Sequence, residues 1–297
     1  MSVSFTPEEN ESVAPVLRAR NRVVLVTGAA GNIGSYFAQK SHLRYDLQLM
    51  VREQDTSDNV DPLHAFGKVI TGDITDLERM KELCRGVDTV LHLAGDPKPS
   101  AVWGDLLQAN IIGTYNTFLA AKANDCRRVI YASSIHAVSG YRSDVQVKTT
   151  EPVNPGDLYG VSKCFGEALA RYMAEKENIS AIVLRIGAFQ PLEAARSESG
   201  LSMLDAWVSR RDLNQLIEKS IDVENLRFAI FHGLSDNRFK RMDISDARML
   251  VGYAPVDDST AQHPQLKDLN LRETVLSHSH ADGKQESGIR EELKASI

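Results

Sequence analysis

Short apolar runs rich in β-branched residues alternate along this chain with stretches of helical periodicity, and that alternation limits the fold more than any other feature. Such runs are typical of buried strands. Because strand–helix–strand units pair in parallel through right-handed crossovers, the chain is expected to be an α/β protein with a doubly wound parallel sheet. The expected strands are 22–27, 47–51, 68–71, 89–93, 128–132 and 181–186, and the expected helices are 33–43, 77–84, 105–124 and 159–177.

A glycine-rich turn joins the first expected strand to the first expected helix. Gly28, Gly31 and Gly34 follow one another at intervals of three residues. The first glycine allows a tight turn, the second lets backbone amides approach a diphosphate, and the third lets the helix pack closely on the sheet. The amino end of the helix then faces the phosphates. In this context a dinucleotide-binding Rossmann fold is favoured over an ordinary tight turn.

The second expected strand lacks the acidic residue that usually holds the ribose diol of NAD. Val51 stands there, followed by Arg52 and Glu53. A guanidinium suits a 2′-phosphate, so NADP is slightly favoured over NAD. The alternative is that Arg52 is a solvated loop cation and Glu53 reaches the diol. The other expected cofactor contacts are Gly28, Ala30, Gly31, Asn32, Ile33, Gly34, Asp73 (for the adenine amine), Ile74, Leu93, Ala94, Gly95, Asn110 and Ile186. Asn110 lies in a mostly apolar helix, where it is expected to bond backbone near the active site or, alternatively, to lie on the helix surface.

The pattern divides the chain into four parts. Residues 21–187 are expected to form the dinucleotide-binding core, and 188–257, where the alternation stops, a small C-terminal substrate-binding lobe. An amphipathic helix carrying Trp207 and Leu213 is expected in that lobe from about Ser202. Residues 1–20 and 258–297 are polar without sustained periodicity and are expected to be flexible tails.

Tyr159 and Lys163 lie four residues apart in an expected helix. Residues at this spacing share one face, so both side chains can point into one pocket. A neighbouring ammonium stabilises tyrosinate and lowers the tyrosine pKa from its ordinary value of about 10. The pair is therefore predicted to transfer a proton beside a hydride-transferring cofactor.

From about residue 23 to 258 the chain resembles the extended short-chain dehydrogenase/reductase family, also called the NAD-dependent epimerase/dehydratase family. The residues that carry the resemblance are TGAAGNIG at 27–34, GDITD at 72–76, HLAG at 92–95, Asn110, Ser133-Ser134 and YxxxK at 159–163. Within the family it is most similar to sugar dehydrogenases of the uronate dehydrogenase kind, through 94–103, 133–138, 159–167, 185–187, 202–207 and 232–237.

The resemblance implies an NAD(P)-dependent oxidoreductase that acts on an aldose, sugar acid or sugar phosphate at the anomeric carbon. It implies that Tyr159 is the general base, that Lys163 holds the nicotinamide ribose, and that Ser134 orients the substrate oxygen. Ile135, His136 and Lys98 are further candidate substrate contacts; Lys98 could meet a phosphate or be a solvated loop lysine.

Two departures from the family pattern concern the substrate. Ile135 stands where uronate dehydrogenases carry asparagine, so one polar contact is absent. Ser202 precedes Met203-Leu204 where the family has the arginine that holds a uronate carboxylate. An arginine–carboxylate pair is bidentate and hard to replace. Arg196, in a nearby insertion, is the alternative cation.

Two other functions remain open at this stage. One is a nucleotide-sugar epimerase or dehydratase that keeps its cofactor bound; only about 70 residues follow Ile186 before the expected tail, which is short for a nucleotide-holding lobe. The other is a cofactor-sensing, NADP-binding protein without turnover. Such proteins commonly lack the tyrosine or the lysine, whereas Tyr159 and Lys163 are both present.

Charge and cysteine content limit the partners. The net charge of −6 argues against a nucleic-acid or anionic-membrane partner, and no apolar run is long enough to span a bilayer. Cys84, Cys126 and Cys164 are expected to be reduced thiols of a cytoplasmic protein, and no metal-type His/Cys cluster is apparent. The family resemblance implies a homodimer formed through the helices at 105–124 and 159–177.

Overall fold

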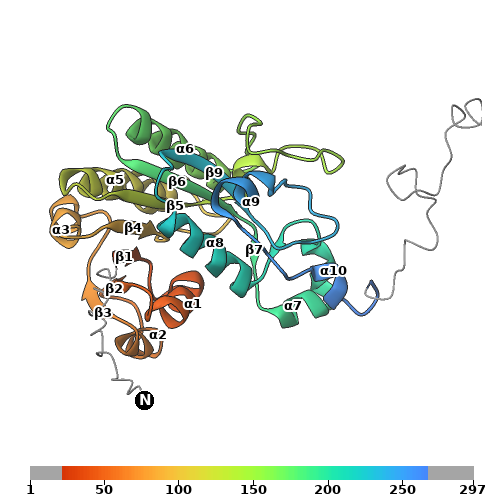
Figure 1. Cartoon of the computed structure of the whole chain (residues 1–297), viewed down its shortest axis with the longest axis horizontal. Coiled ribbons are helices and arrows are strands. Elements are labelled where there is room, and N and C mark those ends of the chain that lie inside the picture. Colours follow the sequence, from red (N-terminus) through yellow and green to blue (C-terminus); the bar gives the residue numbers. More distant parts are fainter. Residues whose placement is uncertain (1–21, 267–297) are drawn as a thin grey trace, which may run out of the picture.

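The computed structural model of the protein describes residues 22–266 and contains a seven-stranded parallel sheet (Figure 1). Every neighbouring pair of strands in this sheet runs parallel. The predicted doubly wound sheet is therefore confirmed. Its strand order is β3 (Lys68–Thr71), β2 (Asp46–Val51), β1 (Val23–Thr27), β4 (Thr89–His92), β5 (Arg128–Ser134), β6 (Ser180–Ile186) and β9 (Phe228–Gly233).

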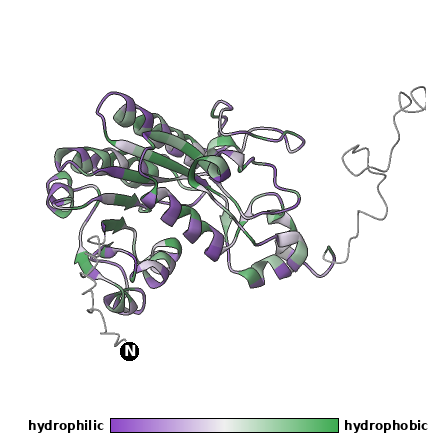
Figure 2. Ribbon diagram, in the orientation of Figure 1, coloured by the Kyte–Doolittle hydropathy of each residue, from purple (hydrophilic) through white to green (hydrophobic). Residues whose placement is uncertain are grey.

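Helices cover both faces of the sheet, and each face has its own apolar core. One core joins the sheet to α1 (Asn32–Ser41), α8 (Arg210–Asp222) and α9 (Ser245–Val251). The other joins it to α3 (Leu77–Leu83), α5 (Gly113–Ala123) and α6 (Leu158–Glu175). Figure 2 shows the strands in hydrophobic green between helices that carry purple polar residues. Continuous apolar runs are required here because both faces of every central strand are buried.

The strand order reverses between β1 and β4. From β1 the chain winds outward through β2 to β3, and from β4 it winds the other way through β5, β6 and β9. The loops that follow β1 and β4 therefore leave the sheet in opposite directions. In open parallel sheets the ligand crevice forms at such a switch point, outside the carboxyl ends of the strands.

The segment after β6 corrects part of the sequence interpretation. No helix begins at Ser202: Trp207 lies in the short strand β8 (Trp207–Val208), which pairs with β7 (Ala188–Phe189), and α8 begins only at Arg210. A 3₁₀-helix, η4 (Glu198–Met203), occupies the expected start. Two elements in the range 188–257, which was expected to form the lobe, belong to the main sheet instead. β9 pairs with β6, and α8 packs on one face of that sheet.

The small lobe is completed by α7 (Leu192–Arg196) and α10 (Ser259–Gln262), which contact each other. Since Ser259 and Thr260 are buried, residues 258–266 belong to the folded part and not to the expected tail. The expected tail at 1–20 and the remainder of the one at 258–297 lie outside the described residues.

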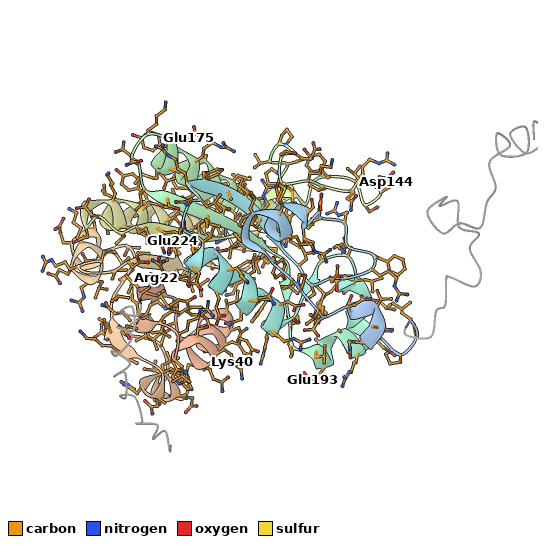
Figure 3. All side chains as sticks on the ribbon, in the orientation of Figure 1. Arg22, Lys40, Asp144, Glu175, Glu193 and Glu224 are labelled. Atoms are coloured by element: carbon orange, nitrogen blue, oxygen red, sulfur yellow. The ribbon has the colours of Figure 1, made fainter. Side chains whose placement is uncertain are left out.

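Polar ties hold the elements around the crevice. The buried Arg185 on β6 donates to Glu167 on α6 at 2.8 and 2.9 Å, and Ser133 on β5 donates to Glu167 at 2.6 Å. These bonds fix α6 against the two strands beneath it. At the opposite, amino end of the strands, Arg22 bonds to Glu224, and both are labelled in Figure 3.

Within the described residues no helix is long and apolar enough to cross a bilayer.

Candidate active site

The glycine turn after β1 forms a backbone cradle. Gly28 has φ +71°, and a Cβ there would lie 2.9 Å from the amide nitrogen of Ala94. A Cβ on Gly34 would lie 2.5 Å from the Gly28 carbonyl oxygen, so α1 packs against the turn too closely for any residue with a side chain at this position. The N-cap of α1 is Gly31, which has no side chain to bond the first amides of the helix. These amides can therefore bind an anion.

The loop after β2 carries an ion pair. Val51 is buried, and the guanidinium of Arg52 donates to Asp55 Oδ1 from Nε at 3.1 Å and from Nη2 at 2.7 Å. The Arg52 amide donates to the other carboxylate oxygen at 2.8 Å. Asp73, after β3, accepts from the amide and hydroxyl of Thr75 at 2.8 and 2.9 Å.

Asp157 begins the helix that holds the tyrosine and the lysine. One of its carboxylate oxygens caps α6 by accepting from the Gly160 amide at 2.7 Å. The other contacts His136 Nδ1 at 2.7 Å. The His136 ring meets the Tyr159 ring edge-on, with centroids 5.4 Å apart. A single aspartate thus fixes both the start of α6 and the orientation of a histidine beside Tyr159.

Lys163 lies one turn after Tyr159, as its spacing predicts. Its Nζ is 5.5 Å from the centre of the Tyr159 ring and donates to the Ala132 carbonyl oxygen at 2.9 Å. Burial lowers the pKa of Lys163 to about 8, and Asp96 opposes that shift. The ammonium is therefore buried close to the phenol without bonding to it.

The Tyr159 phenol differs from the sequence expectation in one respect. Burial raises the pKa of Tyr159 above its usual value, while a hydrogen bond with the Ser134 hydroxyl opposes the shift and the Asp157 and Asp96 charges add to it. The predicted lowering of this pKa by Lys163 is therefore wrong for the protein alone. The physical reason is desolvation: the ring is only 8% exposed, and the lysine's hydrogen bond goes to backbone.

Asn110 bonds backbone near the active site, as its place in an apolar helix predicted. It is buried in a π-helical segment (Leu107–Ile112) and does not line the cavity. Its amide accepts from the Asp96 amide at 2.8 Å and donates to the Asp96 carbonyl at 3.1 Å and to Ser162 at 2.9 Å. Because these bonds use its polar atoms, Asn110 holds the loop after β4 in place.

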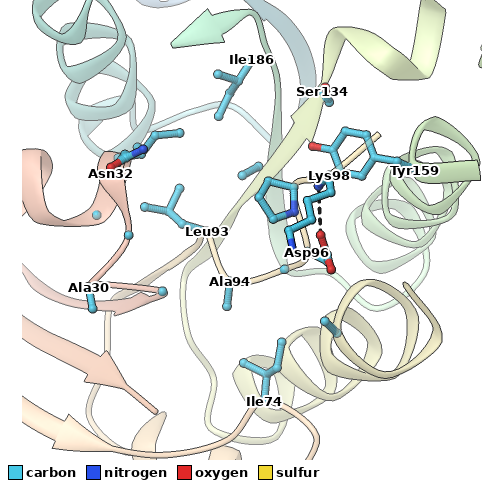
Figure 4. A pocket seen from close by; sticks show the side chains of 18 of the residues that line it. Ala30, Asn32, Ile74, Leu93, Ala94, Asp96, Lys98, Ser134, Tyr159 and Ile186 are labelled. Carbon is cyan, nitrogen blue, oxygen red and sulfur yellow. Dashed lines mark hydrogen bonds between the residues drawn. The ribbon is translucent and has the colours of Figure 1, made fainter. Parts of the chain in front are cut away.

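These parts surround one cavity of about 1090 Å³ that runs across the switch point. Figure 4 shows Ala30 and Asn32 on one side and Ser134 and Tyr159 on the other. Apart from Asn110, the structure brings together in this lining every residue predicted for the site: Gly28, Ala30, Gly31, Asn32, Ile33, Gly34, Arg52, Asp73, Ile74, Leu93, Ala94, Gly95, Lys98, Ser134, Ile135, His136, Tyr159, Lys163 and Ile186.

Several residues of the site were not found from the sequence. Asp55, Gln108 and Gln190 line the cavity, and Asp157 orients His136 from just outside the lining. Asp157 had a detectable signal, since an aspartate three residues before Gly160 at a helix start is a typical N-cap. Asp55 had none, because it lies in a loop whose course no periodicity predicts. Arg196, the alternative cation, is exposed, bonds to Gln262 at 3.1 Å and is not in the lining.

The cavity fits a nicotinamide dinucleotide. The glycine cradle would hold the diphosphate, and adding a Cβ at Gly28 would push into the backbone of Ala94, which closes the other side. Its volume exceeds that of a pocket for a lone small sugar. Among the described residues no three His, Cys, Asp or Glu side chains converge as a metal site.

Comparisons with known proteins show which family the chain resembles. The model of the NAD dependent epimerase/dehydratase family matches residues 24–199. An NAD-dependent glucose-6-phosphate dehydrogenase of Haloferax volcanii is 34% identical over 80% of this chain and 94% of its own length. An L-arabinose 1-dehydrogenase (NAD(P)(+)) of the same organism is 30% identical over 80% and 97%.

A solved structure shows the same fold. The uronate dehydrogenase from Agrobacterium tumefaciens superposes with a TM-score of 0.71 at 29% identity, over 87% of this chain and 91% of that one. The family match spans more than half of the chain, and the two relatives are covered almost completely. The chain therefore belongs to the NAD-dependent epimerase/dehydratase family.

Proposed function

We propose that this protein oxidises the anomeric hydroxyl of an aldose or aldose phosphate to a lactone. It is an enzyme, an NAD(P)-dependent sugar dehydrogenase of the short-chain dehydrogenase/reductase type, the activity shared by its named relatives. The observation that carries the proposal is the position of Tyr159, beside both Ser134 and Lys163, in the cavity that the glycine cradle closes at its other end.

The chain's own residues supply the proton chemistry. Tyr159 accepts the proton of the reacting hydroxyl, and Ser134 holds the oxygen that loses it. The bound nicotinamide supplies the hydride acceptor. Because burial raises the pKa of Tyr159, the phenol needs a nearby positive charge to act as a base, and the Lys163 ammonium provides one 5.5 Å from the ring centre. Lys163 would also bond the nicotinamide ribose.

The substrate end of the cavity favours a neutral or phosphorylated sugar over a uronate. Ser202 takes the place of the arginine expected for a carboxylate, and Arg196 lies outside the lining. Lys98 lies in the lining and is exposed, so its ammonium can meet a phosphate. Its backbone amide donates to the Asp96 carboxylate at 2.9 Å (Figure 4). His136, oriented by Asp157, offers a ring nitrogen to a sugar hydroxyl.

We also propose a cytoplasmic homodimer. Exposed apolar side chains lie along α6 at Leu158, Val161 and Tyr172, and Tyr115 on the neighbouring α5 is half exposed. Together these four residues are named the helix-pair surface below.

The proposed cytoplasmic location is supported by the cysteines. Cys84, Cys126 and Cys164 are free thiols, which suits a reducing compartment.

The direct test is formation of reduced nicotinamide, followed by absorbance with NAD or NADP and a panel of neutral aldoses, aldose phosphates, uronates and simple alcohols. Turnover with an aldose or aldose phosphate is expected, and none with simple alcohols. Absence of turnover on the whole panel would refute the proposal. A bound cofactor that never accumulates in reduced form would support the epimerase or dehydratase alternative.

Tyr159→Phe should lose at least about 10² in turnover, the usual contribution of a general base, while keeping cofactor affinity because the ring remains. Tyr172→Phe is the matched control: it removes a phenol hydroxyl from the same helix, where that hydroxyl bonds only Glu177 in the described structure. Turnover of the control should be unchanged. Equal activity of Tyr159→Phe and the native enzyme would remove Tyr159 from the mechanism.

A further inference from the structure

The loop between β2 and α2 (Ser57–Val60) forms the rim of the cavity at the end far from Tyr159. Arg52, Gln54 and Asp55 from this loop line the cavity, together with Asn59 on α2. Glu53, the residue between them that the sequence offered as an alternative acceptor, is exposed and outside the lining. In this fold the carboxyl end of β2 borders the adenosine ribose. The charges that meet that ribose are therefore those of Arg52 and Asp55.

The two charges hold each other. Asp55 accepts three hydrogen bonds from Arg52, two from the guanidinium and one from the amide, and the Asp55 amide returns one to the Arg52 carbonyl at 3.1 Å. The Asp55 side chain is 14% exposed while that of Arg52 is 63% exposed. The carboxylate is thus fixed by the turn, and the guanidinium lies over it.

Asp55 is a carboxylate at neutral pH. Partial burial opposes its ionisation, but the hydrogen bonds from Arg52 and the positive charge outweigh burial and lower the pKa of Asp55 below its ordinary value. A carboxylate has about four acceptor positions, of which Arg52 uses three. One position remains for a ribose hydroxyl.

We infer that Asp55 is the residue that selects NAD over NADP, by occupying the guanidinium that a 2′-phosphate would need and by accepting a hydrogen bond from the free 2′-hydroxyl. The inference rests on the proposed dinucleotide function of the same cavity. It reverses the preference that Val51 and Arg52 suggest in the sequence, because Arg52 is already paired. A 2′-phosphate approaching Arg52 would meet a fixed negative charge within hydrogen-bonding distance of the same nitrogens.

The test measures binding, not turnover. Calorimetry on the purified protein should give tighter binding of NAD than of NADP. Asp55→Asn keeps an oxygen for the Arg52 amide but removes the charge, so it should raise NADP affinity relative to NAD by about tenfold to a hundredfold, the change expected when one charge-assisted hydrogen bond to phosphate becomes available. Asp58→Asn is the matched control: it removes the same charge from exposed α2, outside the lining.

A second variant keeps the test decisive if Asp55→Asn folds poorly. Arg52→Gln should leave NAD binding nearly unchanged and weaken NADP, because the Asp55 charge is then unpaired. A native protein that prefers NADP, or an affinity ratio that Asp55→Asn shifts no more than Asp58→Asn does, would overturn the inference. Failure to bind either dinucleotide would instead overturn the proposed function, so the two failures are distinguishable.

Discussion

The lysine beside Tyr159 is held in an environment that disfavours its charge. Lys163 is 6% exposed, and its ammonium has one hydrogen bond, to the Ala132 carbonyl, among the described residues. Burial lowers its pKa from 10.5 to about 8. A shift of this size corresponds to about 3 kcal/mol of free energy. The buried Lys163 ammonium therefore lowers the stability of the fold while it places a positive charge beside the Tyr159 phenol.

Because burying the Lys163 charge is unfavourable, Lys163→Met should be more stable than the native protein, by an amount that depends on pH. Below pH 8 both states of the native chain carry the proton and the full cost of burial is present. Between pH 8 and 10.5 the unfolded chain binds the proton that the folded chain has released, so native stability rises with pH. The apolar, similarly sized methionine should therefore be more stable than the native protein at pH 7 by roughly 1–3 kcal/mol, less than the full shift because the Ala132 bond is lost.

Denaturant unfolding of the cofactor-free proteins at pH 7 and at pH 9.5 measures both quantities. The advantage of Lys163→Met should shrink at the higher pH, and the variant should be inactive. Lys40→Met on α1 is the control, since that lysine is exposed and keeps its water. A Lys163→Met protein that is less stable at pH 7, or whose difference from the native chain does not change with pH, would contradict the desolvation argument.

At the scale of elements, two glycines of the turn after β1 meet different requirements: close packing of α1 and close approach of a ligand. A Cβ on Gly34 would meet backbone atoms of Gly28 and Ala29 at 2.5 and 2.8 Å, so this glycine is needed for α1 to pack. A Cβ on Gly31 would have one close neighbour, the Gly28 carbonyl oxygen at 3.3 Å. Packing alone therefore does not require Gly31, and we expect this glycine to serve the dinucleotide, whose phosphates must approach the backbone.

Two single substitutions should separate these roles. Gly34→Ala forces a backbone shift and should cost roughly 1–3 kcal/mol of stability as well as dinucleotide affinity. Gly31→Ala should keep the unfolding midpoint close to that of the native protein and still weaken dinucleotide binding. Thermal unfolding and calorimetric titration of the two variants provide the measurements. Similar midpoints for both variants would show that the helix can move away from the turn.

The core elements were predictable because each carries its own local signal. Strands β1 to β6 carry short apolar runs, and the four helices expected between them were predicted to within two residues at most ends. The short helix α2 between β2 and β3 was not predicted, and three other features also lacked a local signal. The π-helical turn at Asn110 depends on that residue's bonds to Asp96 and Ser162, and β9 joins the sheet only because β6 offers it an edge. The helix expected from Ser202 failed because Trp207 and Val208 pair with Ala188 and Phe189.

The same division holds for the site. Residues that belong to a motif, such as Tyr159 and Lys163, line one cavity, as their spacing predicted. Asp157 and Asp55 act through partners, His136 and Arg52, and their roles depend on how loops bring the pairs together. The pKa of Tyr159 was predicted in the wrong direction because burial, which the sequence does not show, raises it and outweighs the opposing effect of the Ser134 hydroxyl.

At the scale of the whole molecule, one outer surface remains apolar after both faces of the sheet have been covered. In the helix-pair surface, Leu158, Val161 and Tyr172 on α6 are 51%, 45% and 52% exposed, and Tyr115 on the neighbouring α5 is 50% exposed. Their spacing along α6 places them on one stripe of the helix, as at a helix–helix seam. A second copy of this chain is a suitable partner because a symmetric pair buries the stripe on both copies at once.

Light scattering after size-exclusion chromatography should therefore give the mass of a dimer at micromolar concentration, and Val161→Arg/Tyr172→Arg should give a monomer, because each protomer then brings two unpaired charges into the seam. Met249→Arg is the matched control: Met249 is more exposed, at 75%, but lies on α9, on the opposite face of the sheet. The control should remain a dimer. A native protein that is monomeric at about 100 μM, a concentration far above the dissociation constant of a standard interface, would exclude this surface as the dimer seam.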